Sequence, residues 1–512
     1  MNTTEMAPPT DASLKSSPRL TRANLGALTC FGLFVVVGCL GVLNPLILLG
    51  CAAAAITLIL VWLAAKYLRR VGLELWQVFV LTALSGYLLL NYGFENLSLH
   101  IGGFPIIISY GLMYGALGLA VLTQRHLIAR ALREPPVRCA LALLVLAFCH
   151  LILEVPQFGV WALRDSTMCL DAVFMVLGLA WAMKRDSLVF ICRWMTVVFS
   201  LNMLYGFTLP WGEKLWAWSP ESGVFLKVPI LGNYNGTGDL LLAGAVFCIC
   251  VGSFVVKRPA WLMLFLAAAQ FLGVAITQVR RMYVGAVIVL IILVVLGEVK
   301  KFVKLFILLP VAVLVILLAT TVGGLEISGR IGPVNLAFFK DHIRSIETSE
   351  GTPGSSIESR FGMADEALGH FYSHPVFGVG FGEPLLNDID QSNGAAGRVP
   401  HNSSLTYLAR LGAVGLVLWI AFHFSLIKRF VYTYRQRHSC DPQVYAFLLW
   451  FFLFYVLFMI ASFVEPPFEF PSGAVPFYFW TGFALGLMRW HLVPKSKNEH
   501  ELTMLVNTAE TV

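Results

Sequence analysis

Three arginines and one histidine are the residues of this sequence best suited to do chemistry. The segment TQVRRMYVG places Arg280 and Arg281 in a tight turn between two long apolar runs, and Arg360 lies in a later polar segment. The segment VPHNSSLTYL places His401 where the chain becomes apolar again. Guanidinium groups bind diphosphate through paired hydrogen bonds, and a neutral imidazole can accept a proton from an attacking hydroxyl. If these side chains meet, they can bind a diphosphate and assist such an attack.

The local sequence favours the neutral form of His401. Asn402 or Ser403 is expected to be the N-cap of the helix that follows. His401 would then lie beside the positive end of the helix dipole, which disfavours a second positive charge. Two alternatives stay open: an interfacial histidine with no catalytic role, and His374 as the base instead.

The composition indicates the setting of these residues. Of 512 residues, 58% are apolar and only 13% are charged, about half the charge of a soluble protein. This excludes a soluble enzyme and a disordered protein, and the absence of a long Lys/Arg block excludes nucleic acid as a partner. We therefore expect an all-α polytopic integral membrane protein that contacts membrane lipid.

Hydropathy over a window of about 20 residues predicts about 12 to 14 transmembrane helices. We expect a cytoplasmic tail at 1–24, helices over 25–324, a large periplasmic loop at 325–403, helices over 404–490 and a cytoplasmic tail at 491–512. The candidate spans are 25–43, 46–65, 72–91, 104–124, 138–154, 168–183, 187–207, 236–256, 260–279, 282–298, 304–324, 404–426, 443–463 and 475–490.

The positive charges predict the orientation. Every even-numbered span is followed by Lys or Arg, and such an excess marks cytoplasmic loops. Both termini are therefore expected to be cytoplasmic and the loop 325–403 to lie outside. Arg280 and Arg281 would face outward, where arginines do not serve orientation, and this makes them candidates for function.

The outer loop is expected to contain one helix, SSIESRFGMADEALGHFYSHP. Ser355 and Glu358 form a capping box, and Pro375 ends the helix. The expected apolar face, which would lie along the membrane surface or cover a cavity, consists of Ile357, Phe361, Ala364, Leu368 and Phe371. The next stretch, VFGVGFGEP, follows a helix rather than a strand, so it is not a dinucleotide-binding motif. It is either a turn whose amides approach a ligand or a plain loop.

These segments resemble the O-antigen ligase and O-antigen polymerase family, membrane glycosyltransferases that use undecaprenyl-diphosphate-linked glycans. The resemblance covers roughly residues 230–425 and rests on TQVRRMYVG, SRFGMADEALGHFYSHPVFGVGFGE and PHNSSLTYLARLGAVG. Arg280 has Val279 and Arg281 beside it, where the family usually has small residues. Which of the paired arginines is the functional one is therefore open.

The resemblance implies a mechanism and a location, the bacterial inner membrane. The donor diphosphate would lie against Arg280 (or Arg281) and Arg360, while His401 assists an acceptor hydroxyl that attacks the anomeric carbon with inversion. The arginines would neutralise the leaving group, so neither a metal nor a cofactor is expected. The first outward turn, LNPLI, has no acidic residue, whereas metal-dependent membrane oligosaccharyltransferases carry a carboxylate there.

Three further residues are candidates for binding the acceptor: Glu465 and Glu469 in EPPFEFPSG, and Trp216 in an outward loop. The main hypothesis is a ligase that moves a glycan to lipid A-core or another glycan acceptor. The alternative is a polymerase that extends the glycan on its lipid carrier. A transporter or flippase ranks lower, because it would need charges near mid-membrane in several spans.

Overall fold

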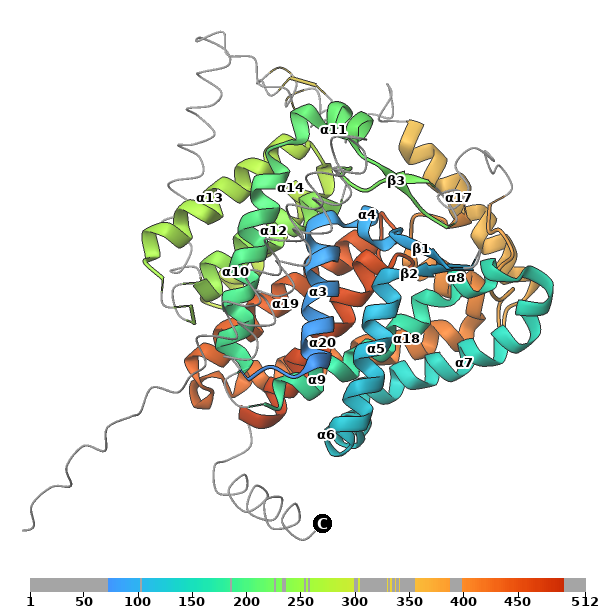
Figure 1. The fold of residues 1–512 in the computed structure, drawn as a ribbon, viewed down its shortest axis with the longest axis horizontal. Coiled ribbons are helices and arrows are strands. Elements are labelled where there is room, and N and C mark those ends of the chain that lie inside the picture. Colours follow the sequence, from blue (N-terminus) through green and yellow to red (C-terminus); the bar gives the residue numbers. More distant parts are fainter. Residues whose placement is uncertain are drawn as a thin grey trace, which may run out of the picture. The chain divides into compact units, whose positions relative to one another are not determined.

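The computed structural model is all-α and polytopic, as expected, with only short strands among the residues that it describes (Figure 1). From Leu75 onward the chain forms one compact unit. The predicted tail 1–24 and the predicted spans 25–43, 46–65 and 304–324 lie outside the described residues, as does the tail after His491. The described residues are 72–101, 104–184, 187–224, 227–232, 236–252, 255–256, 258–298, 303, 329, 332–333, 337, 340, 355–386 and 398–491.

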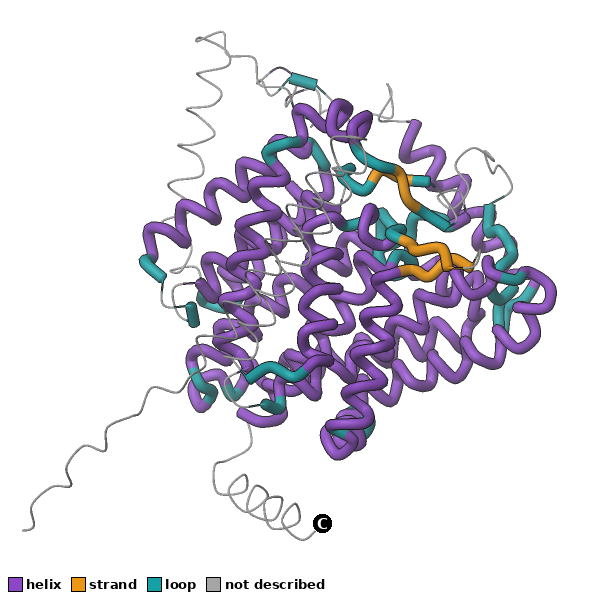
Figure 2. The backbone as a smooth tube through the Cα atoms, viewed as in Figure 1, coloured by secondary structure: helices purple, strands orange, loops and turns teal. Residues whose placement is uncertain are grey.

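The first half of the described chain alternates long helices with short connections. Its elements are α3 (Leu75–Leu90), α4 (Tyr92–Glu95), β1 (Ser98–Ile101), β2 (Phe104–Ile107), α5 (Ile108–Thr123), α6 (Arg125–Ala131), α7 (Pro135–Phe158), α8 (Val160–Leu170), η1 (Asp171–Phe174), α9 (Met175–Ala182), α10 (Ser187–Gly206), η2 (Leu209–Trp211), α11 (Gly212–Trp218), β3 (Glu221–Ser222) and β4 (Val228–Pro229). The strands form two small antiparallel hairpins, β1–β2 and β3–β4 (Figure 2).

The second half contains the longest helices. Its elements are α12 (Gly236–Phe247), the π-helical turn η3 (Cys248–Gly252), α13 (Ala260–Thr277), α14 (Arg280–Val295), α17 (Ser355–Ser373), α18 (Ser403–Arg435), η7 (Arg437–Ser439), α19 (Pro442–Ser462) and α20 (Pro471–His491).

Six of the described helical segments are long and apolar enough to cross a membrane. A helix satisfies its own backbone hydrogen bonds, which a bilayer core requires. The predicted span 168–183 starts too late, since the helical segment runs from Val160 to Ala182. Its early turns carry Arg164 and Asp165, which lower the hydropathy but pair with each other at 2.8 Å.

Helices α9 and α20 pack in backbone contact. A Cβ atom on Gly178 would lie 2.0 Å from the carbonyl oxygen of Phe479, and one on Gly482 would lie 1.8 Å from that of Met175. Glycines permit such close approach between helices where the hydrophobic effect adds little. This contact fixes α20 and, with it, the loop 463–470 that precedes α20.

Helix α18 is kinked at Gly412, which has φ 62° and ψ −160°. The kink frees two carbonyls and two amides from their helical partners, and the loop segment 375–380 takes all four. The hydrogen bonds run from Val379 N–H to Ala409 O (3.0 Å), Gly380 N–H to Arg410 O (2.8 Å), Ala413 N–H to Pro375 O (2.9 Å) and Val414 N–H to Val376 O (3.2 Å). These hydrogen bonds fix the direction of residues 403–411, the first part of α18, relative to the rest of the helix.

The helix expected in the outer loop is present as α17. Of its expected apolar face, Ala364, Leu368 and Phe371 are half-buried, and the side chain of Ile357 lies outside the described residues. Ala367 is the buried residue and packs with Ala409 and Leu385. Phe361, placed on the expected face, is 69% exposed. The short first part of α18 crosses α17 at Ala367. The small side chain of Ala367, rather than the ring of Phe361, therefore contacts α18.

Candidate active site

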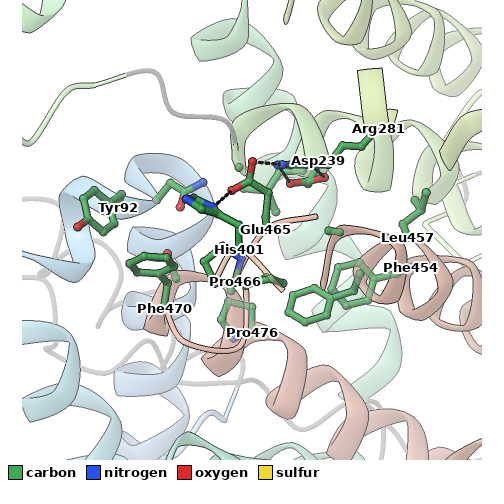
Figure 3. Close-up of a pocket in the computed structure, with 18 residues that line it drawn as sticks. Tyr92, Asp239, Arg281, His401, Phe454, Leu457, Glu465, Pro466, Phe470 and Pro476 are labelled. Atoms are coloured by element: carbon green, nitrogen blue, oxygen red, sulfur yellow. Dashed lines mark hydrogen bonds and ion pairs between the residues drawn. The ribbon is translucent and has the colours of Figure 1, made fainter. Parts of the chain in front are cut away.

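One cavity of about 340 Å³ brings together residues from distant parts of the sequence (Figure 3). Arg281, His401 and Glu465 line it with Asp239, while Phe454, Leu457 and Phe458 of α19 form much of its apolar wall. It also receives residues from the α3–α4 junction, from the loop 463–470 and from α20. Mostly apolar walls with a few converging polar groups are typical of a ligand-binding pocket.

A chain of ionic contacts crosses this pocket. The Nδ1 of His401 lies 3.3 Å from Oε2 of Glu465, and Oε1 of Glu465 lies 2.9 Å from Nη1 of Arg281. The Nη2 of Arg281 donates to Oδ2 of Asp239 at 2.8 Å. Two carboxylates thus share the positive charge of Arg281. The arrangement fixes Glu465, which in turn holds one ring nitrogen of His401.

The other two predicted arginines lie beside this chain. Arg360, on α17, has its Nη2 3.8 Å from Oε1 of Glu465, and its side chain is 42% exposed. Arg280, at the start of α14, is close enough to Arg360 for their positive charges to repel each other. The structure therefore places Glu465 between Arg360 and His401, with Arg280 near Arg360.

The charge state of Glu465 follows from these neighbours. Burial opposes its ionisation, but the hydrogen bond with His401 and the charge of Arg281 outweigh that effect and hold the pKa of Glu465 below its ordinary value. Glu465 is therefore a carboxylate at neutral pH.

The backbone around His401 is fixed on both sides. His401 itself has φ 45°, which is rare for a residue other than glycine. Asn402 is the N-cap of α18: its Oδ1 accepts from Leu405 N–H at 3.2 Å, and its Nδ2 donates to the carbonyl of Phe463 at 3.3 Å. A left-handed residue persists only where its surroundings hold it, and such residues cluster at functional sites.

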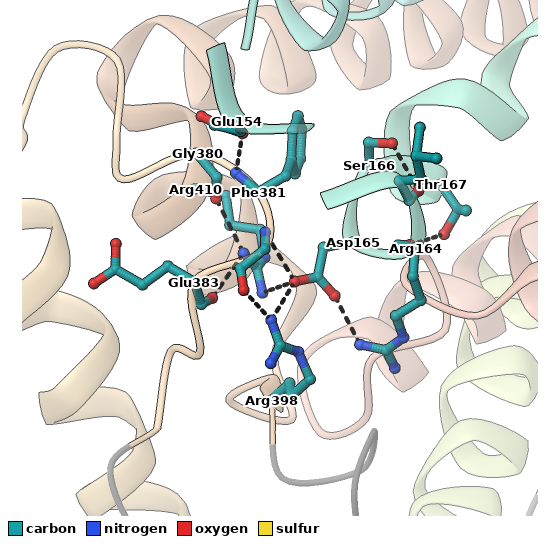
Figure 4. A network of polar contacts seen from close by, with 12 residues as sticks. Glu154, Arg164, Asp165, Ser166, Thr167, Gly380, Phe381, Glu383, Arg398 and Arg410 are labelled. Carbon is teal, nitrogen blue, oxygen red and sulfur yellow. Dashed lines mark hydrogen bonds and ion pairs between the residues drawn. The ribbon is translucent and has the colours of Figure 1, made fainter. Parts of the chain in front are cut away.

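A buried network anchors the segment just before His401 (Figure 4). Asp165 of α8, whose side chain is 1% exposed, contacts Arg398 at 3.0 Å and Arg410 at 2.9 Å. Arg398 also donates to the carbonyl of Gly382 and stacks over the ring of Trp161, 4.6 Å from its centre. Since Arg398 precedes His401 by three residues, this network fixes where the histidine enters the pocket.

The glycine-rich stretch does not present free amides to a ligand. The amide of Phe381 donates to Glu154, and that of Gly382 donates to Asp165 at 3.2 Å. Gly380 has φ 80°, and a Cβ atom there would lie 1.5 Å from Glu154. The glycines thus let the loop lie against α7 and α8, and the plain-loop alternative describes it.

Three predicted candidates lie away from the pocket lining. Glu469 is buried, accepts from Ser403 Oγ at 2.7 Å, and has its pKa raised by burial. Trp216, on α11, is 55% exposed. The alternative base His374 is exposed and has its Nδ1 3.0 Å from Ser373 Oγ. Within the described ranges, no group of three or more His, Cys, Asp or Glu residues is arranged to hold a metal ion.

Sequence reasoning missed Asp239, Asp165, Arg398 and Arg410. A usable signal existed for two of them, because Asp165 and Arg410 are charges of opposite sign within or next to apolar runs, where a charge needs a partner. Asp239 is the acidic residue in the first turn of α12. Acidic side chains often occupy this position in any helix, so its position gave no indication of a functional role.

Comparison with known proteins agrees with the motifs. Residues 262–420 match the family model described as O-Antigen ligase. This segment contains Arg280, Arg281, Arg360 and His401, whereas Asp239 and Glu465 lie outside it. A search of curated proteins found no match. The chain is therefore an integral membrane protein in which residues 262–420 are similar to the O-antigen ligase family.

Proposed function

We propose that this protein is an inverting O-antigen ligase that transfers a glycan from undecaprenyl diphosphate to an acceptor sugar. The observation that carries the proposal is the ionic chain that holds His401 in the pocket, beside Arg360 and Arg280. It combines a base with a cationic surface for a leaving group, inside a segment of the matching family.

His401 serves as the general base. With Nδ1–H donating to the Glu465 carboxylate, Nε2 carries the lone pair that accepts a proton. Glu465 orients the imidazole ring and stabilises the imidazolium that forms, as a carboxylate does when it is hydrogen-bonded to a histidine base. This assigns Glu465 to the positioning of His401 rather than to the acceptor.

Arg280 and Arg360 bind the donor diphosphate. Arg281 is already bound by Asp239 and Glu465, so its charge is largely compensated. The mutual repulsion of Arg280 and Arg360 is relieved when an anion binds between them. This favours Arg280 over Arg281 as the diphosphate-binding member of the pair.

The reaction then balances without a metal or a cofactor. The acceptor oxygen forms a bond to the anomeric carbon while its proton passes to Nε2 of His401. The bond from the anomeric carbon to the diphosphate oxygen breaks, and that oxygen keeps the electron pair. Attack opposite to the leaving group inverts the anomeric configuration, and the two arginines stabilise the charge that develops on the diphosphate.

The proposed location is the periplasmic face of the bacterial inner membrane, with both termini cytoplasmic. The basic helix α6 lies at the bottom of Figure 1, whereas α11 and α17 lie at the top. Because α17 carries Arg360, which lies 3.8 Å from Glu465 of the pocket, the pocket and the basic helix α6 lie at opposite ends of the described bundle. The positive charges favour the cytoplasm for the α6 end.

The test separates binding from transfer. Arg280→Ala or Arg360→Ala removes charge-assisted hydrogen bonds, about 1.5–3 kcal/mol each, so donor affinity should fall by roughly tenfold or more. Lysine should rescue only in part, because it lacks the paired donors. His401→Ala should leave donor affinity intact and slow single-turnover transfer by roughly 10²–10⁴. The matched control is His374→Ala, which should leave both quantities unchanged.

The proposal is wrong if His401→Ala abolishes donor binding while Arg360→Ala leaves it intact. Product analysis distinguishes the two acceptor classes. With purified lipid A-core and lipid-linked glycan offered together, a ligase should label lipid A-core, whereas a polymerase would lengthen the lipid-linked glycan.

A further inference from the structure

Asn91, between α3 and α4, has a backbone conformation that is unusual for its residue type. Its φ of 48° and ψ of −120° lie in a region that side chains other than glycine rarely enter. Hydrogen bonds hold it there: its N–H donates to Tyr87 O at 3.0 Å, and its carbonyl accepts from Phe94 N–H at 3.1 Å. Among the described residues, the other positive-φ residues besides glycine are Gln278 and His401.

The side chain of Asn91 faces the candidate pocket, which it lines with His401 and Glu465. Its amide has no hydrogen-bond partner in the part of the chain that the structure describes. An amide offers two donors and two acceptor sites. A strained residue that presents such a group to a pocket indicates a ligand.

The opposite wall is shaped to admit this amide. Gly236, the first residue of α12, also lines the pocket. A Cβ atom on Gly236 would lie 2.1 Å from Nδ2 of Asn91. Any larger residue at 236 would therefore push the amide out of its place.

Two aromatic rings lie beside Asn91 in the same pocket. Tyr92 and Phe470 pack edge to face, with their ring centres 5.5 Å apart at 86°. In Figure 3 they lie on one side of His401, whereas Arg281 and Asp239 lie on the other. A sugar ring carries hydroxyl groups around its edge and apolar C–H groups on its face. An amide can bind the hydroxyl groups, and an aromatic surface can pack against the apolar face.

We propose that Asn91, with Tyr92 and Phe470 beside it, forms the binding subsite for the acceptor sugar. The assignment to the acceptor rests on the proposed function, in which the arginine side of His401 holds the donor diphosphate. The hydroxyl that gives its proton to His401 must then belong to a sugar that approaches from the side of Tyr92 and Phe470.

The decisive variant is Asn91→Gly. Glycine adopts the observed backbone angles without strain, so the melting temperature should stay the same or rise. Loss of the amide removes one or two hydrogen bonds to the sugar, which should raise the KM for lipid A-core about tenfold. The KM for the undecaprenyl-diphosphate-linked donor should not change, and kcat at saturating acceptor should stay within about twofold of wild type.

A second variant displaces the amide without altering Asn91. Gly236→Ala should raise the acceptor KM in the same direction, because its methyl group occupies the place of Nδ2. The matched control is Gly111→Ala in α5, where nothing lies within 4 Å of the added methyl group. That control should behave as wild type in both KM values.

Three results would overturn the proposal: an unchanged acceptor KM in Asn91→Gly, a rise in the donor KM instead, or a lower melting temperature. The last would mean that the strained conformation serves the fold rather than the ligand. Each is distinct from failure of the proposed function, which would show as unimpaired transfer by His401→Ala.

Discussion

Replacing Asp165 by asparagine tests whether the buried arginine network holds the active-site segment. The carboxylate of Asp165 contacts Arg398 at 3.0 Å, Arg410 at 2.9 Å and Arg164 at 2.8 Å. The side chains of Arg410 and Arg398 are only 1% and 7% exposed, so water cannot replace the lost charge. Removing one member of such a buried ion pair costs about 3–5 kcal/mol.

The effect is measurable as thermal unfolding of the purified protein in detergent. A loss of that size should lower the melting temperature by about 3–5 °C in a chain of 512 residues. Asp171→Asn is the matched control. Asp171 is also fully buried and lies six residues further along the same helical segment. Its carboxylate, however, accepts from Tyr110 Oη at 3.5 Å and makes no ion pair with an arginine among the described residues. Its replacement should change the melting temperature little.

The link to His401 can be tested separately. The double variant of Asp165→Ala with Arg398→Ala should be less destabilised than the sum of the two single variants, by about 0.5–3 kcal/mol, because both remove the same contact. Transfer should slow in Asp165→Asn at temperatures where the protein remains folded, since displacing the base by about 1 Å can cost 10²-fold. The reasoning is refuted if Asp165→Asn is as stable as Asp171→Asn.

Four further predictions concern charge, metal and topology. The pKa of Glu465 is lower in the folded protein than in the unfolded chain. Its ion pairs therefore stabilise the fold fully at a pH above the pKa of the unfolded chain, and this stabilisation is lost as the pH falls through the pKa of the folded state. Glu465→Gln should therefore be less stable than wild type at pH 7, and unfolding curves should converge in acid. Burial raises the pKa of Glu95 to about 7, so its charge destabilises the fold as the pH rises from about 4.5 to 7. At pH 8, Glu95→Gln should therefore be more stable than wild type by up to about 3 kcal/mol of unfolding free energy, which a higher melting temperature would show. Transfer should persist in excess EDTA; loss with EDTA and recovery with Mg²⁺ or Mn²⁺ would contradict the arginine-only mechanism. Ser373→Cys should react with an impermeant thiol reagent once the outer membrane is permeabilised and Ser439→Cys only after the inner membrane is opened; the reverse order would invert the topology.

The helices were predictable because each needs only local information. Apolar runs of about 20 residues specify where a chain can cross a bilayer, and most described helices lie on predicted spans. However, β2 occupies the start of the span 104–124, and α18 extends nine residues beyond the span 404–426. The exception at Val160–Ala182 has a physical cause, since Arg164 and Asp165 lower the local hydropathy while pairing inside the protein. Hydropathy averaged over a window counts each charged residue as polar, even where its charge is neutralised by an ion pair with a neighbour.

The candidate site was predictable in part, for a related reason. Arg280, Arg360 and His401 stand out because they are polar residues at apolar boundaries. Glu465 was recognised as a candidate, but its contact with His401 spans 64 positions and depends on how α20 packs against α9. Asn91 gave no sequence signal, because neither its backbone angles nor the fit against Gly236 can be derived from residue types.

The two ionic networks differ in exposure, and this decides what each can do. Asp165 gathers three arginines with its side chain 1% exposed, so no ligand can reach them and the network serves the fold. Glu465 gathers Arg281, Arg360 and His401 with its side chain 23% exposed, and the Arg360 contact is long at 3.8 Å. A partly solvated pair at that distance is weak, so in the proposed mechanism a diphosphate binds Arg360 while Glu465 keeps its contact with His401. The same grouping of one carboxylate with several cations thus anchors the chain in one place and leaves a binding cation available in the other.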